Sequence, residues 1–398
     1  MIEQLLQPTV QEFIRQHAND DEQSLLLKHK TIHGLPASLI AWQISGRRKS
    51  KSKIPLYYNT ANMVYPPGVN LEQSSSEETA VFKASLLQRQ LPAAKSLVDL
   101  SGGFGVDSFF FSKVIERVTY VEPNAELIEY AKHNHLQLGA ENIRHIHSSA
   151  EEFLESLTGP VDCFYIDPSR RSASNKKIFE LDECEPNIIS ILPTIFAHAD
   201  YLLVKAAPLL DLQEGLLDLN SVKQVWVVSV RNEVKELLFL CAKNYSDEPV
   251  VSAVNLESDH EPFTFKLSDE RAVQAPVSDP LTYLYEPNAS ILKAGAFKVI
   301  AATYALGKIH PNTHLYTSNE LINRFPGRIF KINTHLKADA KTIATHFPEN
   351  KVNVITRNYP LSPDALKKKF KLRDGGERYL IGCSGEKQKF LLAAERLK

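Results

Sequence analysis

Three glycines stand within four positions of the segment VDLSGGFGVDSFFFS, residues 98–112, directly after a short apolar run. Glycine adopts backbone conformations that other residues avoid, and it lets a ligand come close to the main chain. The apolar residues that follow are typical of a helix, whose first N–H groups would face the same ligand. Gly102, Gly103 and Gly105 therefore predict a binding turn between a strand and a helix.

The spacing of these glycines and a neighbouring acid indicate the type of ligand. From Gly103 the chain reads G-F-G-V-D-S, which lacks the third glycine of the nicotinamide-dinucleotide fingerprint, and an aspartate beside a pyrophosphate would be repulsive. Asp99, at the strand end, instead suits a ligand with a cationic amine, and S-adenosylmethionine is such a ligand. We therefore expect Asp99, Ser101, Gly103 and Gly105 to bind this cofactor.

Two later segments offer further cofactor contacts. Glu122, in VTYVEPN, lies 17 residues after Gly105 and could accept hydrogen bonds from both ribose hydroxyls. Ser149 and Ala150, in HSSAEEFL, stand where an adenine edge would be recognised. His145 and His147 share a strand face without a nearby Cys or Asp, so they favour packing or surface positions, and no metal site is predicted.

The segment FYIDPSRR places an acid and two arginines after another strand. Asp167, followed by proline, would project a carboxylate from a rigid turn and accept a hydrogen bond or proton from a substrate nucleophile. Arg170 and Arg171 suit a phosphate or a planar base, and we expect Arg170 to orient the substrate. Lys205, in VKAAPLLD, would lie at the same edge as a further substrate contact.

These residues need a sheet that brings strand ends together. Short apolar runs alternate with helix-length segments, which favours a parallel sheet covered on both faces. The residues between 250 and 267 resemble an antiparallel hairpin at a sheet edge. The expected strands are Leu97–Leu100, Val118–Val121, Ile143–His147, Cys163–Ile166, Leu202–Lys205 and Val225–Val230.

The flanking regions have other patterns. Residues 1–62 have helical periodicity, and Ser75 with Glu78 resembles a capping box that opens a helix. Toward the C-terminus we expect one helix in ASILKAGAFKVIAATYAL and strands in HLYTSN, RIFKIN, KVNVITRN and RYLIGCS. Ser362 should cap a helix in SPDALKKKF, and a closing amphipathic helix should end the chain.

Composition and charge bound the class of protein. The 398 residues include 43% hydrophobic and 23% charged residues, as in ordinary globular proteins, and their number favours two or three domains. No apolar run is long enough to span a bilayer, the first residues do not resemble a signal peptide, and the four cysteines are scattered. We therefore expect a cytoplasmic protein with buried free thiols and no membrane partner.

The charges are distributed unevenly along the chain. Residues 330–398 hold 15 Lys/Arg against 7 Asp/Glu, although the whole chain has a net charge of −1. A basic end on an acidic body indicates a polyanionic partner, or else lysines that keep a small domain soluble. The cluster Lys367, Lys368 and Lys369, with Lys371 and Arg373 beyond it, is the candidate for phosphate contacts.

Taken together, these motifs resemble those of class I S-adenosylmethionine-dependent methyltransferases over residues 72–235. The whole chain resembles the bacterial family with a C-terminal THUMP-like domain, in LEQSSSEETAVFKA, IDPSRR, VRNEVKELL, YLYEPNASILKAG and NVITRNYPLSPDALKKKF. The resemblance implies an α/β fold with a Rossmann-like, mostly parallel, seven-stranded sheet. It also implies S-adenosyl-L-methionine as cofactor and RNA (tRNA or rRNA) as partner. We expect a helical N-terminal region (1–65), a methyltransferase domain (66–270), a connecting segment (271–328) and a THUMP-like domain (329–398).

Some positions depart from the family's patterns. Ser101 replaces the usual first glycine, and Ser149 replaces the usual acid before AEEF. Ser169 and Arg170 stand where enzymes that methylate exocyclic amines carry proline and an aromatic residue. No cysteine stands near Lys205, which argues against uracil C5 methylation.

RNA methylation is therefore the leading hypothesis. A methyltransferase acting on a protein or a small molecule, and a non-catalytic module that binds S-adenosylmethionine and RNA, are the alternatives.

Overall fold

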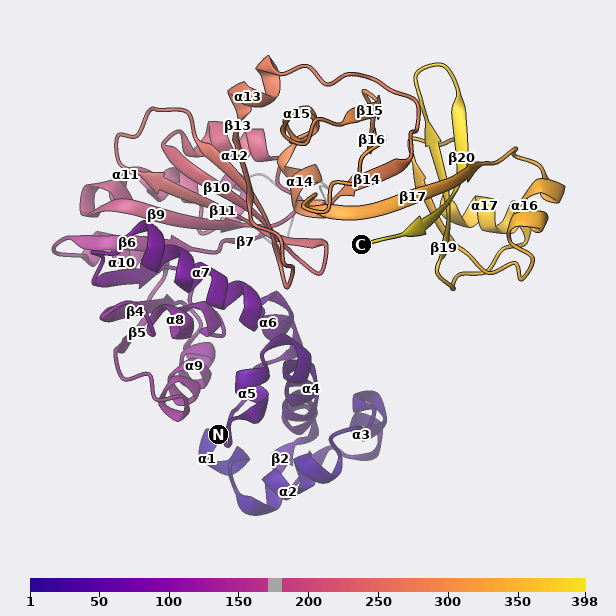
Figure 1. The fold of residues 1–398 in the computed structure, drawn as a ribbon. Helices are drawn as coiled ribbons and strands as arrows, with labels where there is room; N and C mark the ends of the chain where they lie inside the picture. The colour runs from indigo at the N-terminus through magenta and orange to yellow at the C-terminus, as the bar shows by residue number, and fades with distance from the viewer. Residues whose placement is uncertain (171–180) are drawn as a thin grey trace. The chain divides into compact units, whose positions relative to one another are not determined.

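The computed structural model describes residues 1–170 and 181–398. Contacts between residues divide the chain into two compact units. The first contains Met1–Lys223 and Leu237–Ser246, and the second contains Gln224–Glu236 and Asp247–Lys398. Figure 1 shows the elements of both, and each unit is described by itself below. The four-part division expected from the sequence stays a prediction.

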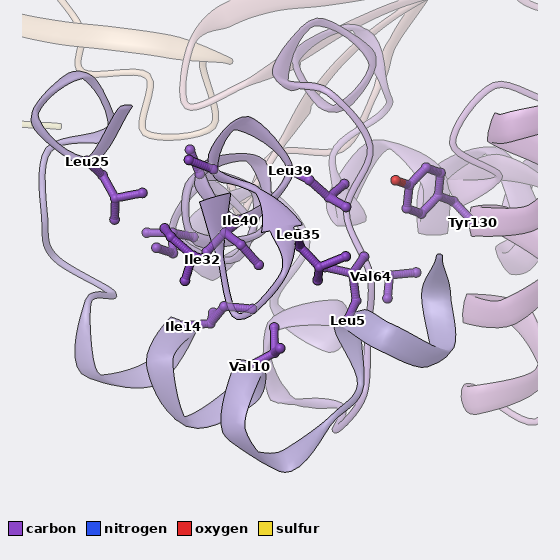
Figure 2. Close-up of a cluster of buried hydrophobic side chains, with 13 residues drawn as sticks. Leu5, Val10, Ile14, Leu25, Ile32, Leu35, Leu39, Ile40, Val64 and Tyr130 are labelled. Atoms are coloured by element: carbon purple, nitrogen blue, oxygen red, sulfur yellow. The ribbon is translucent and has the colours of Figure 1, made fainter. Parts of the chain in front are cut away.

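The first unit begins with short helices and a small hairpin, which confirms the helical periodicity of residues 1–62. A buried cluster joins these helices to each other and to Tyr130 of α9, as Figure 2 shows. The N-terminal region is therefore packed onto the rest of its unit. Its elements are α1 (Ile2–Leu5), α2 (Pro8–Gln16), α3 (Glu22–Lys28), β1 (Thr31–Ile32), β2 (Leu35–Pro36), α4 (Ala37–Lys53), α5 (Pro55–Asn59) and α6 (Gly68–Gln73).

A mostly parallel sheet forms the centre of the first unit. Its strands lie in the order β11-β9-β6-β3-β4-β5, all parallel except for the antiparallel pair β11 and β9. β3 begins this series in the chain and lies inside the sheet, so neighbouring strand ends surround its carboxyl end. The strands are β3 (Ser96–Asp99), β4 (Arg117–Glu122), β5 (Ile143–His147), β6 (Val161–Ile166), β9 (Ala199–Ala206) and β11 (Glu233–Ala242).

Helices connect these strands. They are α7 (Glu77–Gln90), α8 (Val106–Phe111), α9 (Ala125–Gln137), α10 (Ala150–Ser156), α11 (Ile188–His198) and α12 (Leu212–Leu219). A short antiparallel pair, β7 (Ser169–Arg170) and β8 (Cys184–Glu185), and the 3-10 turn Leu181–Glu183 lie between β6 and α11. The N-cap of α7 is Ser76, one residue after the expected Ser75, because the Ser76 side chain accepts the Thr79 N–H.

With three further strands, the sheet has nine strands within the described residues, where seven were expected. β10 (Val222–Val230) pairs in parallel with β12 (Val250–Leu256), which pairs antiparallel with β13 (Phe263–Lys266). The edge hairpin predicted for 250–267 is therefore confirmed. β11 was not anticipated: it follows a tight turn at Arg231 and Asn232, which both have positive φ, as a two-residue hairpin turn requires.

The second unit also holds a sheet of its own, in the order β15-β16-β14-β17-β20-β19-β18. All its pairs are antiparallel except β18 with β19. The strands are β14 (Tyr283–Pro287), β15 (Gly307–His310), β16 (Thr313–Ser318), β17 (Gly327–His335), β18 (Asn353–Arg357), β19 (Arg378–Ser384) and β20 (Lys389–Arg396). The helices are α13 (Leu267–Ala272), α14 (Ala289–Ala294), α15 (Val299–Thr303), α16 (Ala340–His346) and α17 (Pro363–Phe370).

The expected closing helix is wrong, because its residues form β20 between β17 and β19. Leu391 and Ala393 pack in the cluster that contains Leu366 of α17 and Ile343 of α16, whereas Leu392 and Ala394 pack in a cluster on the other face. A strand buried on both faces reads as a continuous apolar run, which periodicity does not distinguish from a helix. The pairing of this run with two neighbours decides for the strand.

Two other C-terminal expectations can be compared with the structure. The helix expected in ASILKAGAFKVIAATYAL is two helices, because Gly295 ends α14 in a left-handed conformation with φ of 78°. The helix in SPDALKKKF is confirmed, since the Ser362 side chain accepts the Ala365 N–H and Pro363 is its first residue. In the described part of the chain, no helix combines the length and the apolar character that a bilayer crossing would require.

Candidate active site

Four of the predicted residues lie at or next to carboxyl ends of parallel strands in the first unit. Asp99 ends β3 and Glu122 ends β4, while Asp167 follows β6 directly and Lys205 is the penultimate residue of β9. Ile166 pairs with Val204, which brings the following residues, Asp167 and Lys205, side by side. This edge of the sheet is where open parallel sheets bind ligands.

Asp99 and Ser101 brace the turn from inside. Asp99 is buried, and its Oδ1 accepts hydrogen bonds from the Ser101 N–H at 3.0 Å and the Ser101 hydroxyl at 3.2 Å. Its Oδ2 accepts the hydroxyl of Ser108, at 2.6 Å. The Ser101 Oγ also accepts the Asp167 N–H at 2.7 Å. Both side chains therefore fix the turn, and Ser101 connects the end of β3 to the end of β6.

The three glycines of the turn differ in how much free space surrounds their Cβ positions. A Cβ on Gly102 would lie 2.3 Å from the Tyr120 ring, and one on Gly105 would lie 2.7 Å from His135 Nε2, so protein side chains fill that space. Gly103 has φ of 54°, and the nearest atom to its Cβ position is the Ser101 carbonyl oxygen at 3.7 Å. Gly103 is therefore the position where the turn is open to a ligand.

Glu122 is held in place by two backbone donors. Its Oε2 accepts the Gly103 N–H at 2.8 Å, and its Oε1 accepts the Asn124 N–H at 2.9 Å. Burial raises the pKa of Glu122, while the hydrogen bonds from Asn124 and Gly103 oppose the shift. Each carboxylate oxygen has a second lone pair, so this residue can accept two hydroxyl donors in the orientation that the turn imposes.

Ser149 has a structural task that the sequence analysis did not anticipate. It is the N-cap of α10, where its Oγ accepts the Glu152 N–H at 3.2 Å and its own N–H donates to Glu152 Oε2 at 3.3 Å. This is a capping box. Ala150, the first residue of the helix, is buried. Both residues follow β5 as expected, but the Ser149 hydroxyl serves the helix.

Asp167 and Lys205 form an ion pair, with Lys205 Nζ 2.5 Å from Asp167 Oδ2. The Asp167 side chain is 31% exposed and that of Lys205 is 12% exposed, so the carboxylate is the more accessible partner. Its Oδ1 can therefore receive a proton or hydrogen bond from an acceptor molecule while Oδ2 stays with Lys205. The structure brings these two predicted residues together.

Beneath the turn lies a buried polar cluster that sequence reasoning missed. Lys83 of α7 is fully buried, with its Nζ 3.3 Å from Asp107 Oδ1 and 3.0 Å from Ser75 Oγ. The hydroxyls of Ser75 and Tyr165 both donate to Asp107 Oδ2, at 2.7 Å each. Burial alone would raise the pKa of Asp107, but the charges of Lys83 and Lys205 outweigh it and hold the pKa below its ordinary value.

A signal for this cluster exists in the sequence. The buried positions of α7 include Thr79, Ala80, Lys83, Ala84 and Leu87, at helical spacing. A lysine on an otherwise apolar helix face needs a buried partner, and Asp107 provides it. Asp107 stands in the first turn of α8, directly after Gly105 and Val106.

The remaining substrate-binding candidates belong to other segments of the chain. Arg170 is in β7, where it pairs with Cys184, and Arg171 lies outside the described residues. Lys367, Lys368 and Lys369 belong to α17 of the second unit. Lys367 Nζ lies 2.8 Å from both Asp364 Oδ1 and Asp374 Oδ2, so its charge is compensated, whereas Lys368 and Lys369 are exposed.

His145 and His147 have separate contacts. His145 Nε2 lies 2.8 Å from His135 Nδ1, and His147 Nε2 lies 2.9 Å from the Pro123 carbonyl oxygen. Among the residues that the structure describes, no group of three or more His, Cys, Asp or Glu side chains could hold a metal ion.

The buried position of Asp99 leads to a pH-dependent stability. Burial raises its pKa to about 7, against the lowering effect of the Ser108 and Ser101 hydrogen bonds. The folded state therefore binds this proton more tightly than the unfolded state, and the stabilisation present near pH 4 is lost as the pH rises through about 7. We expect Asp99→Asn, which cannot ionise, to gain stability relative to the wild type by up to about 1.4 kcal/mol per pH unit in this window. Urea unfolding of both proteins between pH 4.5 and 8 measures this, and parallel curves would contradict it.

Two family models match the C-terminal part of the chain. A family model described as THUMP domain-like matches residues 327–396, and one described as a ferredoxin-like domain matches residues 283–326. A search of curated proteins found no match.

Among solved structures, a "putative methyltransferase" from Porphyromonas gingivalis W83 is 30% identical, with a TM-score of 0.87 over 100% of this chain and 99% of the other. Another match, SMU.1697c from Streptococcus mutans, described as a "putative methyltransferase" in complex with SAH, is 14% identical, with a TM-score of 0.31 over 40% of this chain and 95% of the other. The similarity to the Porphyromonas protein spans both units. The chain therefore belongs to the bacterial family of class I S-adenosylmethionine-dependent methyltransferases that carry a C-terminal THUMP-like domain.

Proposed function

We propose that the protein transfers a methyl group from S-adenosylmethionine to RNA, and that the basic surface of its second unit binds that RNA. The observation that carries the proposal is the arrangement at one sheet edge: an open Gly103, a fixed Glu122 and an accessible Asp167. Gly103 and Asp167 follow β3 and β6, and Glu122 ends β4, the neighbour of β3 on its other side in the sheet.

The residues present fit the proposed cofactor. Gly103 leaves its Cβ position open, and Glu122 has one remaining lone pair on each carboxylate oxygen for the two ribose hydroxyls. Asp99 and Ser101 contribute by fixing the turn, and Ser149 and Ala150 by fixing the start of α10. When bound, S-adenosylmethionine supplies a methyl group activated by its sulfonium centre.

The protein's task in this reaction is alignment. Positioning of two reactants can lower a barrier by roughly 7–11 kcal/mol. Asp167 would accept a hydrogen bond or a proton from the acceptor atom, and Lys205 holds the carboxylate in one orientation. Arg170 and Arg171, which follow Asp167 in the segment FYIDPSRR, would orient the acceptor.

The second unit supplies the proposed contact with RNA. Lys368, Lys369, Lys371 and Arg373 are exposed at the end of α17 and just beyond it. Exposed cations that neutralise phosphates release counterions, which gives RNA binding a steep dependence on salt. Lys367 would add little to this surface because two carboxylates already compensate its charge.

Transfer of label tests the proposal. Protein would be incubated with methyl-tritiated S-adenosylmethionine and separate RNA, protein and small-molecule fractions from cells lacking the gene. We expect label in RNA, and a loss of about 10²-fold or more in Asp167→Asn, which keeps the size of the side chain but cannot take a proton.

The other outcomes of this experiment separate the alternatives. Label confined to protein or small molecules would overturn RNA as the acceptor. Absence of label from every fraction, with S-adenosylhomocysteine still bound by the wild type, would overturn catalysis in favour of a binding module.

Alanine substitutions at Gly102 and Gly103 test the location of the cofactor. Gly103→Ala should cost about 1 kcal/mol of folding stability, because Ala is disfavoured at positive φ, and weaken S-adenosylhomocysteine binding about tenfold or more. Gly102→Ala should instead cost about 1–3 kcal/mol or more, because its Cβ would overlap the Tyr120 ring. Calorimetric titration and urea unfolding measure the two effects. Equal affinities of Gly103→Ala and the wild type would place the cofactor elsewhere.

The lysines of α17 provide a matched test of RNA binding. Lys368→Ala and Lys369→Ala should each reduce the slope of log K against log salt by about one. Lys367→Ala, the control in the same helix, should leave the slope close to the wild-type value because Asp364 and Asp374 already pair with that lysine. Filter binding of RNA at several salt concentrations gives the slopes. Identical slopes for all four proteins would remove α17 from the RNA surface.

A further inference from the structure

Two carbonyl groups of the glycine turn are held by buried side chains. The Tyr120 hydroxyl of β4 donates to the Gly103 carbonyl oxygen at 2.6 Å. His135 Nε2 of α9 lies 2.8 Å from the Gly105 carbonyl oxygen. Both side chains are fully buried. Since a carbonyl oxygen only accepts hydrogen bonds, His135 Nε2 must carry a proton.

The Gly105 carbonyl determines which form of His135, and through it of His145, is present. Burial lowers the pKa of His135 to about 3 and that of His145 to about 4, so both rings are neutral at pH 7. A neutral imidazole has one N–H, and His135 uses it for Gly105. Its Nδ1 must then accept, and His145 Nε2 at 2.8 Å is the donor. The hydrogen bonds form a chain from His145 through His135 to Gly105.

The carbonyl contacts also set the direction of two N–H groups. In a planar trans peptide, the C=O and the following N–H point to opposite sides. The N–H groups of Phe104 and Val106 therefore point away from Tyr120 and His135. Among the described residues, neither N–H has a hydrogen-bond partner in the protein. The two carbonyl contacts therefore fix the orientation of both peptide groups of the turn.

Close packing leaves the turn little freedom to choose another arrangement. The rings of Tyr120, His135 and His145 contact one another, with centroids 5.2 Å apart for Tyr120 and His145 and 5.1 Å apart for the two histidines. The Cβ positions of Gly102 and Gly105 would overlap with Tyr120 and His135. Hydrogen bonds and packing therefore favour the same conformation of the glycine turn.

We infer that Tyr120, His135 and His145 are positioning residues that hold the glycine turn in the conformation in which Gly103 is open to the cofactor. The inference rests on the proposed function, because the ligand that the turn would receive is the proposed cofactor, S-adenosylmethionine. None of the three side chains needs to touch the cofactor, since they act through the carbonyl groups of Gly103 and Gly105.

Binding of S-adenosylhomocysteine, measured by calorimetry at pH 7.5, tests the inference. His135→Leu removes the donor to Gly105 and should weaken binding about tenfold or more, whereas His135→Gln, whose amide can replace Nε2–H, should stay within about threefold of the wild type. Tyr120→Phe removes one hydroxyl and should weaken binding about fivefold. His198→Leu is the control. His198 also contacts a glycine carbonyl oxygen, that of Gly159 at 3.2 Å, but this contact lies at the amino end of β9.

Nitrogen NMR of the imidazole rings reports the tautomer of His135. A purely structural role would not restrict this ring to one tautomer. We expect His135 to be protonated at Nε2 and unprotonated at Nδ1, without tautomer exchange. If His135→Leu does not fold, Tyr120→Phe, which keeps nearly the same side-chain volume, still decides the outcome.

Failure of the inference is distinguishable from failure of the proposed function. A wild-type protein that does not bind S-adenosylhomocysteine would overturn the proposed function and this inference with it. Wild-type binding with unchanged affinity in His135→Leu and Tyr120→Phe, or a His135 ring protonated at Nδ1, would overturn the inference alone.

Discussion

The hydroxyl of Ser101 joins the two halves of the candidate site. It donates to Asp99 at the end of β3 and accepts the Asp167 N–H at the end of β6. The turn that would hold the cofactor and the carboxylate that would face the acceptor are therefore fixed to each other by one side chain. Methyl transfer needs its reacting atoms aligned, so a rigid connection between these strand ends is the constraint on which the rest of the site depends.

Burial strengthens this arrangement. Lys83 and Asp107 form an ion pair beneath the turn, with hydroxyl groups of Ser75 and Tyr165 completing the coordination of Asp107. Removal of one partner of such a buried pair typically costs about 3–5 kcal/mol, because the other charge is left without compensation. The helices of residues 1–62 also take part, since Tyr57 of α5 packs in one cluster with Phe104 of the turn. The N-terminal region is thus a structural support of the site.

The sequence predicted the parts of the site that follow from sheet geometry. Asp99, Glu122, Asp167 and Lys205 could be placed because carboxyl ends of parallel strands meet at one edge. Their hydrogen-bond partners could not be placed, since Ser108, Tyr120 and His135 reach the turn from helices and strands whose packing is long-range. Ser149 and Ala150 stay predicted adenine contacts, and the capping box that Ser149 also forms was not anticipated.

The errors in secondary structure have a similar origin. Residues 389–396 form β20 rather than a helix because β17 and β19 pair with it on both sides, which no local pattern reveals. The strand β11 was missed because its turn, Arg231 and Asn232, lacks the glycine that usually marks a two-residue hairpin. Gly295 interrupts a helical pattern that seemed continuous from apolar spacing alone. In each case a tertiary contact or a single backbone angle outweighed periodicity.

The central claim is that the glycine turn and Glu122 receive S-adenosylmethionine. A crystal structure of the protein with S-adenosylhomocysteine tests it most directly. We expect the ribose hydroxyls of the ligand within hydrogen-bond distance of both Glu122 oxygens. We also expect its amino-acid part to pass over Gly103. A ligand bound away from Gly103 and Glu122, or a turn that changes its backbone conformation to admit it, would contradict the account.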